Sequence, residues 1–317
     1  MRRIILDTDL SMGEPGSEID DGFALALAAA DPELRLELIT SVNGNTDVET
    51  ATLLSLELAE RLGLSDVPVV RGAAAPLTRP DRARGAPEEI RERYGRHVPT
   101  PGYAAAAIAD LVMRSPGEIT IVAIGPLTNV AAAIVLEPAL AENVQEIVVM
   151  GGIFLGQTLQ ASMPGEFNVW VDPEAADTVL HSGAPLRWVG LDVTNRVRLT
   201  REHADRLAQG TGGFGPFAAE ATVRWIERMR KEHPGDPSLS DSCAMHDPLA
   251  VAVVAHPELV TWRDAHVSVV TGEGKARGVM VTDLLTSAEP PAPNCRIATD
   301  VDVDAFMASF LGALQAL

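Results

Sequence analysis

Short apolar runs along this chain alternate with longer stretches in which apolar side chains recur at helical spacing. The runs predict buried strands at 3–7, 36–42, 67–71, 119–124, 146–150, 186–193 and 296–298, and a hairpin from 266–270 and 279–284. The helical spacing predicts helices at 21–30, 46–62, 103–114, 127–136, 173–181, 201–209, 214–232, 247–255 and 303–314. This alternation is typical of an α/β fold: an open, mixed and mostly parallel sheet with helices on both faces.

The composition is that of an ordinary globular protein, with 317 residues of which 46% are hydrophobic and 22% charged. No Pro/Ser-rich linker or break in composition divides the chain, so we expect a single domain over residues 1–317. The formal net charge is −19. A surface this acidic repels phosphate backbones, so we expect no nucleic-acid partner. It does not exclude one small nucleotide-like ligand, because a bound cation reverses the local charge.

The cysteine content and the hydropathy pattern predict where the protein resides. Cys243 and Cys295 are its two cysteines, and their spacing fits neither a disulfide framework nor a metal site. The first residues run directly into a strand without a signal-peptide pattern, and no apolar run approaches the length of a membrane span. We therefore expect a cytoplasmic protein that does not interact with membranes.

Four carboxylates follow the first predicted strand within a short stretch: Asp7 and Asp9, then Asp20 and Asp21. Carboxylates gathered at the carboxyl end of a buried strand repel one another unless a cation lies among them. An all-oxygen set suits Ca²⁺ or Mg²⁺ rather than zinc or copper. The alternative interpretation is a pair of helix N-caps with a solvated acidic loop.

Other polar residues also follow predicted strands. Asn45 follows 36–42, Gly125-Pro-Leu-Thr-Asn129 follows 119–124, and Gly151-Gly152 follows 146–150. Glu166-Phe-Asn168 and His246-Asp247 come later in the chain. Because the carboxyl ends of parallel strands share one edge, where open α/β sheets bind ligands, we expect these groups to gather there.

In their number and order these motifs resemble the nucleoside hydrolases, the inosine-uridine-preferring family. The resemblance extends nearly end to end. Its motifs are the opening aspartate cluster, Val-Asn-Gly-Asn45, Gly-Pro-Leu-Thr-Asn129, Val-Met-Gly-Gly152, Glu166-Phe-Asn168, His246-Asp247-Pro-Leu-Ala, Arg277-Gly-Val-Met-Val-Thr-Asp and Ala298-Thr-Asp-Val-Asp-Val-Asp.

The resemblance implies a Rossmann-like nucleoside hydrolase fold and calcium-dependent hydrolysis of the N-glycosidic bond of ribonucleosides, which gives free base and ribose for nucleoside salvage. One Ca²⁺ would also hold the 2′- and 3′-hydroxyls. We further expect a homodimer or homotetramer. The implied metal ligands are Asp9, Asp21, Asp247 and the main-chain carbonyl of Ile124. The implied substrate-binding residues are Asp20, Asn45, Met150, Gln160, Glu166 and Asn168, where Gln160 replaces a common asparagine.

The implied catalytic residues are Asp9, as base for the attacking water, and His246, which would protonate or polarise the leaving base. Cleavage of a C–N glycosidic bond builds positive charge on the sugar, which carboxylates and the carboxamide oxygen of Asn168 can stabilise. A water beside a cation has a lowered pKa, so a modest base can complete its deprotonation. A histidine that titrates near neutrality would supply the proton to the base.

One departure from the family pattern lies between Asp9 and the Asp20-Asp21 pair. The family usually has three residues at this place, whereas here residues 10–19 fill the gap, with Pro15-Gly16 as a candidate remnant of the usual Pro-Gly. One hypothesis is a surface bulge. The other is a lid that orders over bound ribose and reshapes the pocket.

Two other functions remain open at this point. The sequence Asp7-Thr-Asp9 also fits a haloacid-dehalogenase-like Mg-dependent phosphohydrolase, although that reading leaves Glu166 and His246 unexplained. The second alternative is a non-catalytic nucleoside- or sugar-binding protein of the same fold. The preferred base is not readable, because residues 82–97 replace a histidine-containing loop of many pyrimidine-preferring members. Trp225 or Phe217 could stack on a base or belong to the core.

Overall fold

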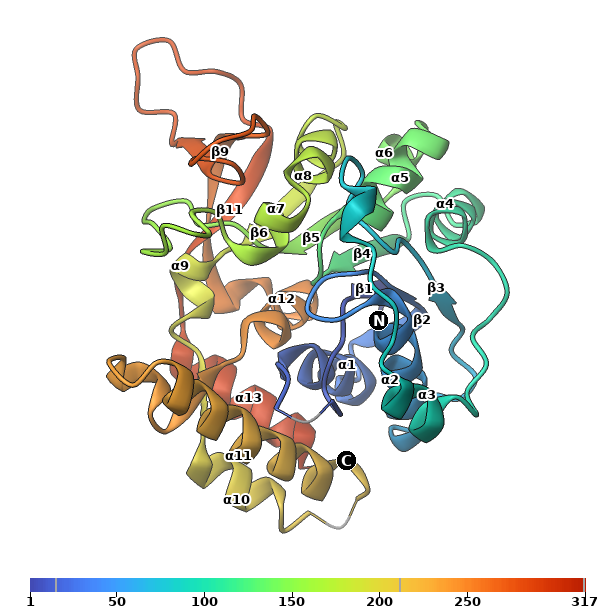
Figure 1. The fold of residues 1–317 in the computed structure, drawn as a ribbon. Coiled ribbons are helices and arrows are strands. Elements are labelled where there is room, and N and C mark those ends of the chain that lie inside the picture. Colours follow the sequence, from blue (N-terminus) through green and yellow to red (C-terminus); the bar gives the residue numbers. More distant parts are fainter. Residues whose placement is uncertain (15, 211, 316) are drawn as a thin grey trace.

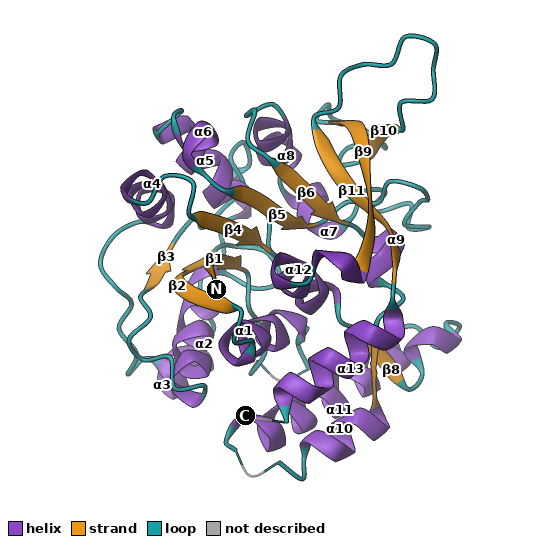
Figure 2. Cartoon of the chain, turned by 180° about the vertical axis from the view of Figure 1, so that it is seen from behind, coloured by secondary structure: helices purple, strands orange, loops and turns teal. Residues whose placement is uncertain are grey.

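A mixed, mostly parallel sheet with helices on both faces forms the protein, as predicted (Figures 1 and 2). The computed structural model describes residues 1–14, 16–210, 212–315 and 317. Within them nine strands form the main sheet in the order β10-β9-β11-β6-β5-β4-β1-β2-β3. These strands are β1 (Arg2–Thr8), β2 (Leu34–Ser41), β3 (Val69–Arg71), β4 (Ile119–Ala123), β5 (Glu146–Met150), β6 (Leu186–Val189), β9 (Val260–Val269), β10 (Met280–Asp283) and β11 (Cys295–Val301).

In the sheet, neighbouring strands pair in parallel along β11-β6-β5-β4-β1-β2-β3. Strand β9 pairs antiparallel with both β11 and β10. The predicted hairpin is therefore confirmed, although β9 begins six residues before the predicted start at 266 because its first half pairs with β11. The carboxyl ends of β1, β2, β4 and β5 lie at one edge. That edge carries the polar motifs of the sequence.

Helices cover the two faces of the sheet and enclose a separate apolar core on each side (Figure 1). One core contains residues of α1 (Asp20–Ala30), α2 (Val48–Arg61), α11 (Phe214–Glu232), α12 (His246–Ala255) and α13 (Val303–Leu314). The other contains residues of α4 (Ala104–Arg114), α5 (Thr128–Leu136), α6 (Leu140–Asn143) and α8 (Pro173–Leu180). Side chains of β1 alternate between the cores, with Ile4 and Leu6 in the first and Ile5 in the second.

Several short elements escape the sequence pattern. The predicted strand 186–193 is wrong in its second half, where the chain turns at Gly190 into helix α9 (Leu191–Thr194). The stretch 73–101, in which the sequence pattern predicts no element, contains the helices η1 (Pro80–Arg82) and α3 (Glu88–Tyr94). The other unpredicted elements are α7 (Phe167–Val171), β7 (Arg198–Thr200), η2 (Pro237–Leu239), β8 (Ser242–Ala244) and η3 (Pro257–Leu259), whereas α10 (Arg201–Leu207) confirms the helix predicted at 201–209. Apart from α3, the unpredicted elements have three to five residues, which is too few to show a period.

No helix in the described part of the chain combines the length and the apolar character needed to cross a membrane.

Candidate active site

Three aspartates from two helices converge at the carboxyl edge of the sheet. Asp20 and Asp21 begin α1, Asp247 lies in the first turn of α12, and their carboxylate oxygens lie within 4.8 Å of one another. All three are buried, and the first turn of each helix favours negative charge there. The sequence prediction that these distant segments meet is confirmed by this geometry.

Asp9 follows β1 and is also buried. Its Oδ2 accepts a hydrogen bond from the backbone N–H of Asn45 at 2.6 Å, and the Asn45 Nδ2 donates to Asp21 at 3.2 Å. Gly44 makes this approach feasible, because a Cβ at that position would lie 2.0 Å from Asp9 Oδ2. Thr8 donates its hydroxyl to the other oxygen of Asp21. One strand end and one turn therefore position both carboxylates.

The electrostatics of this cluster call for a cation. Burial and neighbouring carboxylates raise the pKa of Asp9, Asp20 and Asp247 well above ordinary values, and burial raises the pKa of Asp21 to about 6. Asp9 Oδ1 and Asp20 Oδ1 are buried with no hydrogen-bond partner among the described residues. Unpaired buried acceptors are costly, and an all-oxygen donor set fits a hard divalent cation. The residues present therefore fit a metal ion of this class.

A second group of polar residues lies after β4 and β5. Asn168 donates its Nδ2 to the carbonyl of Ile124 at 2.9 Å and to that of Met150 at 3.3 Å, so its Oδ1 is free to face the cavity. Glu166 is the N-cap of α7 and accepts hydrogen bonds from the backbone N–H groups of Asn168 and Gly152 at 2.8 and 3.0 Å. Burial raises the pKa of Glu166 despite these hydrogen bonds.

His246 begins α12 and pairs through its Nδ1 with the hydroxyl of Thr194 at 2.7 Å. Burial, and secondarily the charge of Arg198, lowers the pKa of His246 to about 4. The expectation of a histidine that titrates near neutrality is therefore wrong for this chain as it stands, because its surroundings disfavour the imidazolium. If the Thr194 hydroxyl donates to Nδ1, the neutral ring carries its proton on Nε2 and can still polarise a leaving base by hydrogen bonding.

These groups border a cavity of about 780 Å³, large enough for a nucleoside. The predicted residues among its lining are Asp20, Asn45, Ile124, Met150, Gln160, Glu166, Asn168, His246 and Asp247. Asp9 and Asp21 are buried beside Asp20 and Asp247 rather than exposed in the wall. Trp225 lines the cavity, whereas Phe217 lies outside that wall, beneath the guanidinium of Arg61 at 4.7 Å.

Glu18, Phe167 and Arg198 are among the lining residues that the sequence analysis did not assign to the site. Phe167 stands between Glu166 and Asn168, which the sequence analysis assigned to the site, so its place in that motif could have indicated that it lines the cavity. Arg198 lies on β7, a strand too short to predict.

Asp7 belongs to a different part of the structure from the other three opening aspartates. Its Oδ1 accepts hydrogen bonds from Thr40 Oγ1 at 2.6 Å and Asn129 Nδ2 at 2.8 Å, and burial raises its pKa to about 7. Asn129 also donates to the carbonyl of Ser41 at 3.0 Å. Asp7 and the Gly-Pro-Leu-Thr-Asn motif therefore join β1, β2 and α5 beneath the site.

In the inserted segment, the described residues 10–14 and 16–19 pack against the rest of the protein, and Glu18 forms part of the cavity wall. Leu10, Met12 and Ile19 are each at most 2% exposed and belong to the core, whereas Glu18 reaches the cavity. The described residues of the segment therefore do not form a surface bulge, and that they order over bound ribose stays a prediction. Pro15, of the candidate Pro-Gly remnant, lies outside the described residues.

Comparisons with known proteins agree with this geometry. Residues 4–308 match the family model described as inosine-uridine preferring nucleoside hydrolase. The chain is 37% identical over 309 residues to the non-specific ribonucleoside hydrolase RihC of Klebsiella pneumoniae, covering 96% of this chain and 95% of that protein.

Two solved structures are similar over almost their whole length. A plant nucleoside hydrolase, PpNRh1, has a TM-score of 0.86 at 28% identity, with 100% of this chain and 99% of that chain covered. A purine-preferring ribonucleoside hydrolase from Gardnerella vaginalis has a TM-score of 0.85 at 29% identity, with 99% and 98% covered.

The fold and the site therefore define an enzyme that hydrolyses N-glycosyl bonds. More particularly, the chain belongs to the inosine-uridine preferring nucleoside hydrolase family and is a ribonucleoside hydrolase. This membership does not support the phosphohydrolase alternative, and it contradicts the non-catalytic one.

Proposed function

We propose that this protein hydrolyses ribonucleosides to free base and ribose in a calcium-dependent reaction that serves nucleoside salvage. The observation that carries the proposal is the pair of buried, unpartnered oxygens, Asp9 Oδ1 and Asp20 Oδ1, beside two further carboxylates at one edge of the cavity. Asp9, Asp21, Asp247 and the Ile124 carbonyl would hold the cation. Bound calcium supplies positive charge that lowers the pKa of a nearby water and attracts the vicinal ribose hydroxyls.

Asp9 accepts the proton of the attacking water in this proposal. One of its oxygens is held by the Asn45 backbone N–H, and the other has no partner among the described residues. A carboxylate fixed in this way presents a single free oxygen to the water, which is the geometry that a general base needs.

The ribose contacts come from Asp20, Asn45, Glu166 and Asn168, with Met150 and Gln160 in the cavity wall. The free Oδ1 of Asn168 stabilises the positive charge that develops on the sugar, while its amide nitrogen is anchored by two carbonyls. Glu166 reaches toward the 5′-hydroxyl. Since backbone N–H groups hold both of its oxygens, it is fixed before substrate arrives.

His246 assists departure of the base. Thr194 fixes the orientation of its ring, and burial keeps it neutral, so it donates a hydrogen bond to the base rather than a full positive charge. The match of RihC, a non-specific ribonucleoside hydrolase, supports a broad substrate range.

The test is a panel of inosine, uridine, cytidine, adenosine and guanosine with free ribose measured, before and after chelation and after return of calcium or magnesium. We expect ribose release that is lost on chelation and restored by calcium. Release that survives chelator dialysis, or that only magnesium restores, contradicts the calcium proposal. We also propose that residues 1–317 form one domain, that the protein is a homodimer or homotetramer, and that it is cytoplasmic. Light scattering measures the oligomeric state, and cell fractionation checks the location.

A further inference from the structure

Glu18 adds a carboxylate to the cavity from the inserted segment. It lines the cavity, and one of its oxygens lies within 4.8 Å of a carboxylate oxygen of Asp20 and of a ring nitrogen of His246. No described residue donates a hydrogen bond to the carboxylate. Burial, then the charges of Asp21 and Glu166, raise its pKa to about 7, and only Arg228 acts in the opposite direction. The group is therefore an acceptor that lacks a donor.

The backbone around Glu18 is held on both sides. Its carbonyl accepts a hydrogen bond from Ser11 Oγ at 3.0 Å, and the next residue, Ile19, is buried in the core. Arg228 of α11 donates to the Gly16 carbonyl at 2.7 Å. These contacts fix the place from which the Glu18 side chain enters the cavity.

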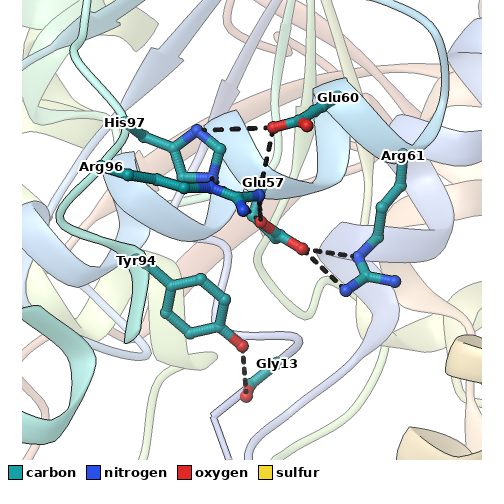
Figure 3. A network of polar contacts seen from close by, with 7 residues as sticks. All are labelled: Gly13, Glu57, Glu60, Arg61, Tyr94, Arg96 and His97. Atoms are coloured by element: carbon teal, nitrogen blue, oxygen red, sulfur yellow. Dashed lines mark hydrogen bonds and ion pairs between the residues drawn. The ribbon is translucent and has the colours of Figure 1, made fainter. Parts of the chain in front are cut away.

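The other end of the segment is tied to the surface of α2 through α3. The hydroxyl of Tyr94 donates to the carbonyl of Gly13 at 3.5 Å, a contact that Figure 3 shows beside the ion pairs of Glu57. Met12 lies so close to α1 that a Cβ on Gly22 would be 2.2 Å from its sulfur. The described part of the segment is therefore held in place by contacts with the helices around it. Among its described residues, Glu18 is the acidic side chain that lines the main cavity.

We propose that Glu18 is a specificity-determining residue, which accepts a hydrogen bond from a donor of the bound nucleoside: an N–H of the base or the 5′-hydroxyl. This inference rests on the proposed function, which puts ribose beside Asp20 and the base beside His246. Glu18 lies within reach of both. A cation held by Asp9, Asp21 and Asp247 would favour the ionised form of Glu18. The ionised carboxylate accepts and does not donate, so it favours neutral ligands with a donor and disfavours a 5′-phosphate or another anion by repulsion.

The test compares Glu18→Ala and Glu18→Gln with Glu14→Gln as the matched control. Glu14 lies in the same segment and has the same side chain, but it borders a separate groove together with Phe217 rather than the main cavity. With inosine we expect kcat/KM of Glu18→Ala to fall about 10- to 100-fold, the size of a hydrogen bond to a charged acceptor. Glu18→Gln should lose less because it keeps a carbonyl oxygen, and Glu14→Gln should stay within twofold.

Substrates that lack one donor identify the partner. Purine riboside has no N–H on its base, and 5′-deoxyinosine has no 5′-hydroxyl. For each we compare the ratio of kcat/KM between the unaltered enzyme and Glu18→Ala. The ratio should collapse toward one for the substrate that lacks the contacted donor and persist for the other. Inosine 5′-phosphate should be a better ligand of Glu18→Gln than of the unaltered enzyme.

Three results overturn the inference. If kcat/KM of Glu18→Ala stays within twofold of the unaltered enzyme on every substrate, Glu18 makes no contact with the nucleoside. If kcat/KM falls equally on all three substrates, the substitution has damaged the site in general. A lowered melting temperature or calcium content in Glu18→Gln, but not in Glu14→Gln, assigns Glu18 to folding or the metal. Failure of the unaltered enzyme to release ribose from any nucleoside contradicts the proposed function itself, a result distinct from these three.

Discussion

Two clusters of acidic groups in this molecule have the same spacing but opposite surroundings. Asp20, Asp21 and Asp247 meet at the carboxyl edge of the sheet, and Glu57, Glu60 and His97 meet on the outer side of α2 (Figure 3). In each set the potential ligand atoms lie within 4.8 Å of one another. Spacing alone would make both candidate metal sites.

The second cluster already contains its cations. Glu57 pairs with Arg61 at 2.7 Å, Arg96 at 2.8 Å and His97 at 2.9 Å, and Glu60 pairs with Arg96 at 3.2 Å. Burial raises the pKa of Glu57, but the hydrogen bonds from His97 and Arg61 outweigh burial, so its pKa lies below the ordinary value.

The first cluster shows the reverse. Among the described residues, no Lys or Arg forms an ion pair with Asp20, Asp21 or Asp247, and their pKa values lie above the ordinary range. The comparison teaches that a metal site is indicated by acids without counter-charges, more than by acids in proximity.

The largest expected effect is that of Asp21→Ala. Loss of one carboxylate leaves the cation with too few ligands, so calcium and ribose release should disappear together. Elemental analysis of purified protein and the nucleoside panel measure both. Glu57→Gln is the control from the other cluster and should keep calcium at the unaltered stoichiometry. Retention of both metal and activity by Asp21→Ala would place the site elsewhere.

Asp9→Asn should lower kcat by several orders of magnitude while ribose still binds. The amide keeps an oxygen for the cation but cannot accept the proton of water, and a general base contributes about 10²–10⁴-fold. Steady-state kinetics and ribose binding by calorimetry separate the two effects. A loss in kcat below tenfold would move the role of the base to another residue.

His246→Ala should have a smaller and substrate-dependent effect. We expect about 10²-fold lower kcat/KM for inosine, whose base departs poorly without a hydrogen-bond donor. A p-nitrophenyl riboside, whose leaving group needs no proton, should be nearly unaffected. Thr194→Val tests the orientation of the ring. It should also lower kcat/KM for inosine more than for the p-nitrophenyl riboside, but by a smaller factor than His246→Ala. Equal losses on both substrates would give His246 a structural role.

The sequence predicted one of the two clusters, and the reason is topological. Asp9 directly follows a buried strand, and Asp20 and Asp21 begin the helix after it, so the parallel sheet brings them to the edge where Asp247 also arrives. No such rule places His97 beside Glu57, because its turn follows a helix in a stretch without periodicity.

The same reasoning accounts for what the sequence missed inside the site. Thr194 contacts His246 across 52 residues, and it ends a four-residue helix that begins inside the predicted strand 186–193. Glu18 was visible as a charge in the insertion, but its direction depends on the burial of Leu10, Met12 and Ile19. Long-range packing of irregular segments determines such contacts, and local pattern carries little information about it.

Glu57→Gln gives the smallest expected effect and tests the second cluster itself. Because the folded-state pKa of Glu57 is lowered, its ionised form stabilises the fold at neutral pH, and this contribution is lost as pH falls through that pKa. The variant should therefore lose about 1–2 kcal/mol near pH 7, a few degrees in melting temperature, with activity unchanged. The gap to the unaltered protein should narrow as the pH falls through the lowered pKa of Glu57 and close where the Glu57 side chain is protonated. Glu60→Gln, at a more exposed carboxylate, should cost less. Melting curves from about pH 3 to 8 at constant ionic strength measure the gap. A gap that widens toward acid would show that the network does not stabilise the protein through the Glu57 charge.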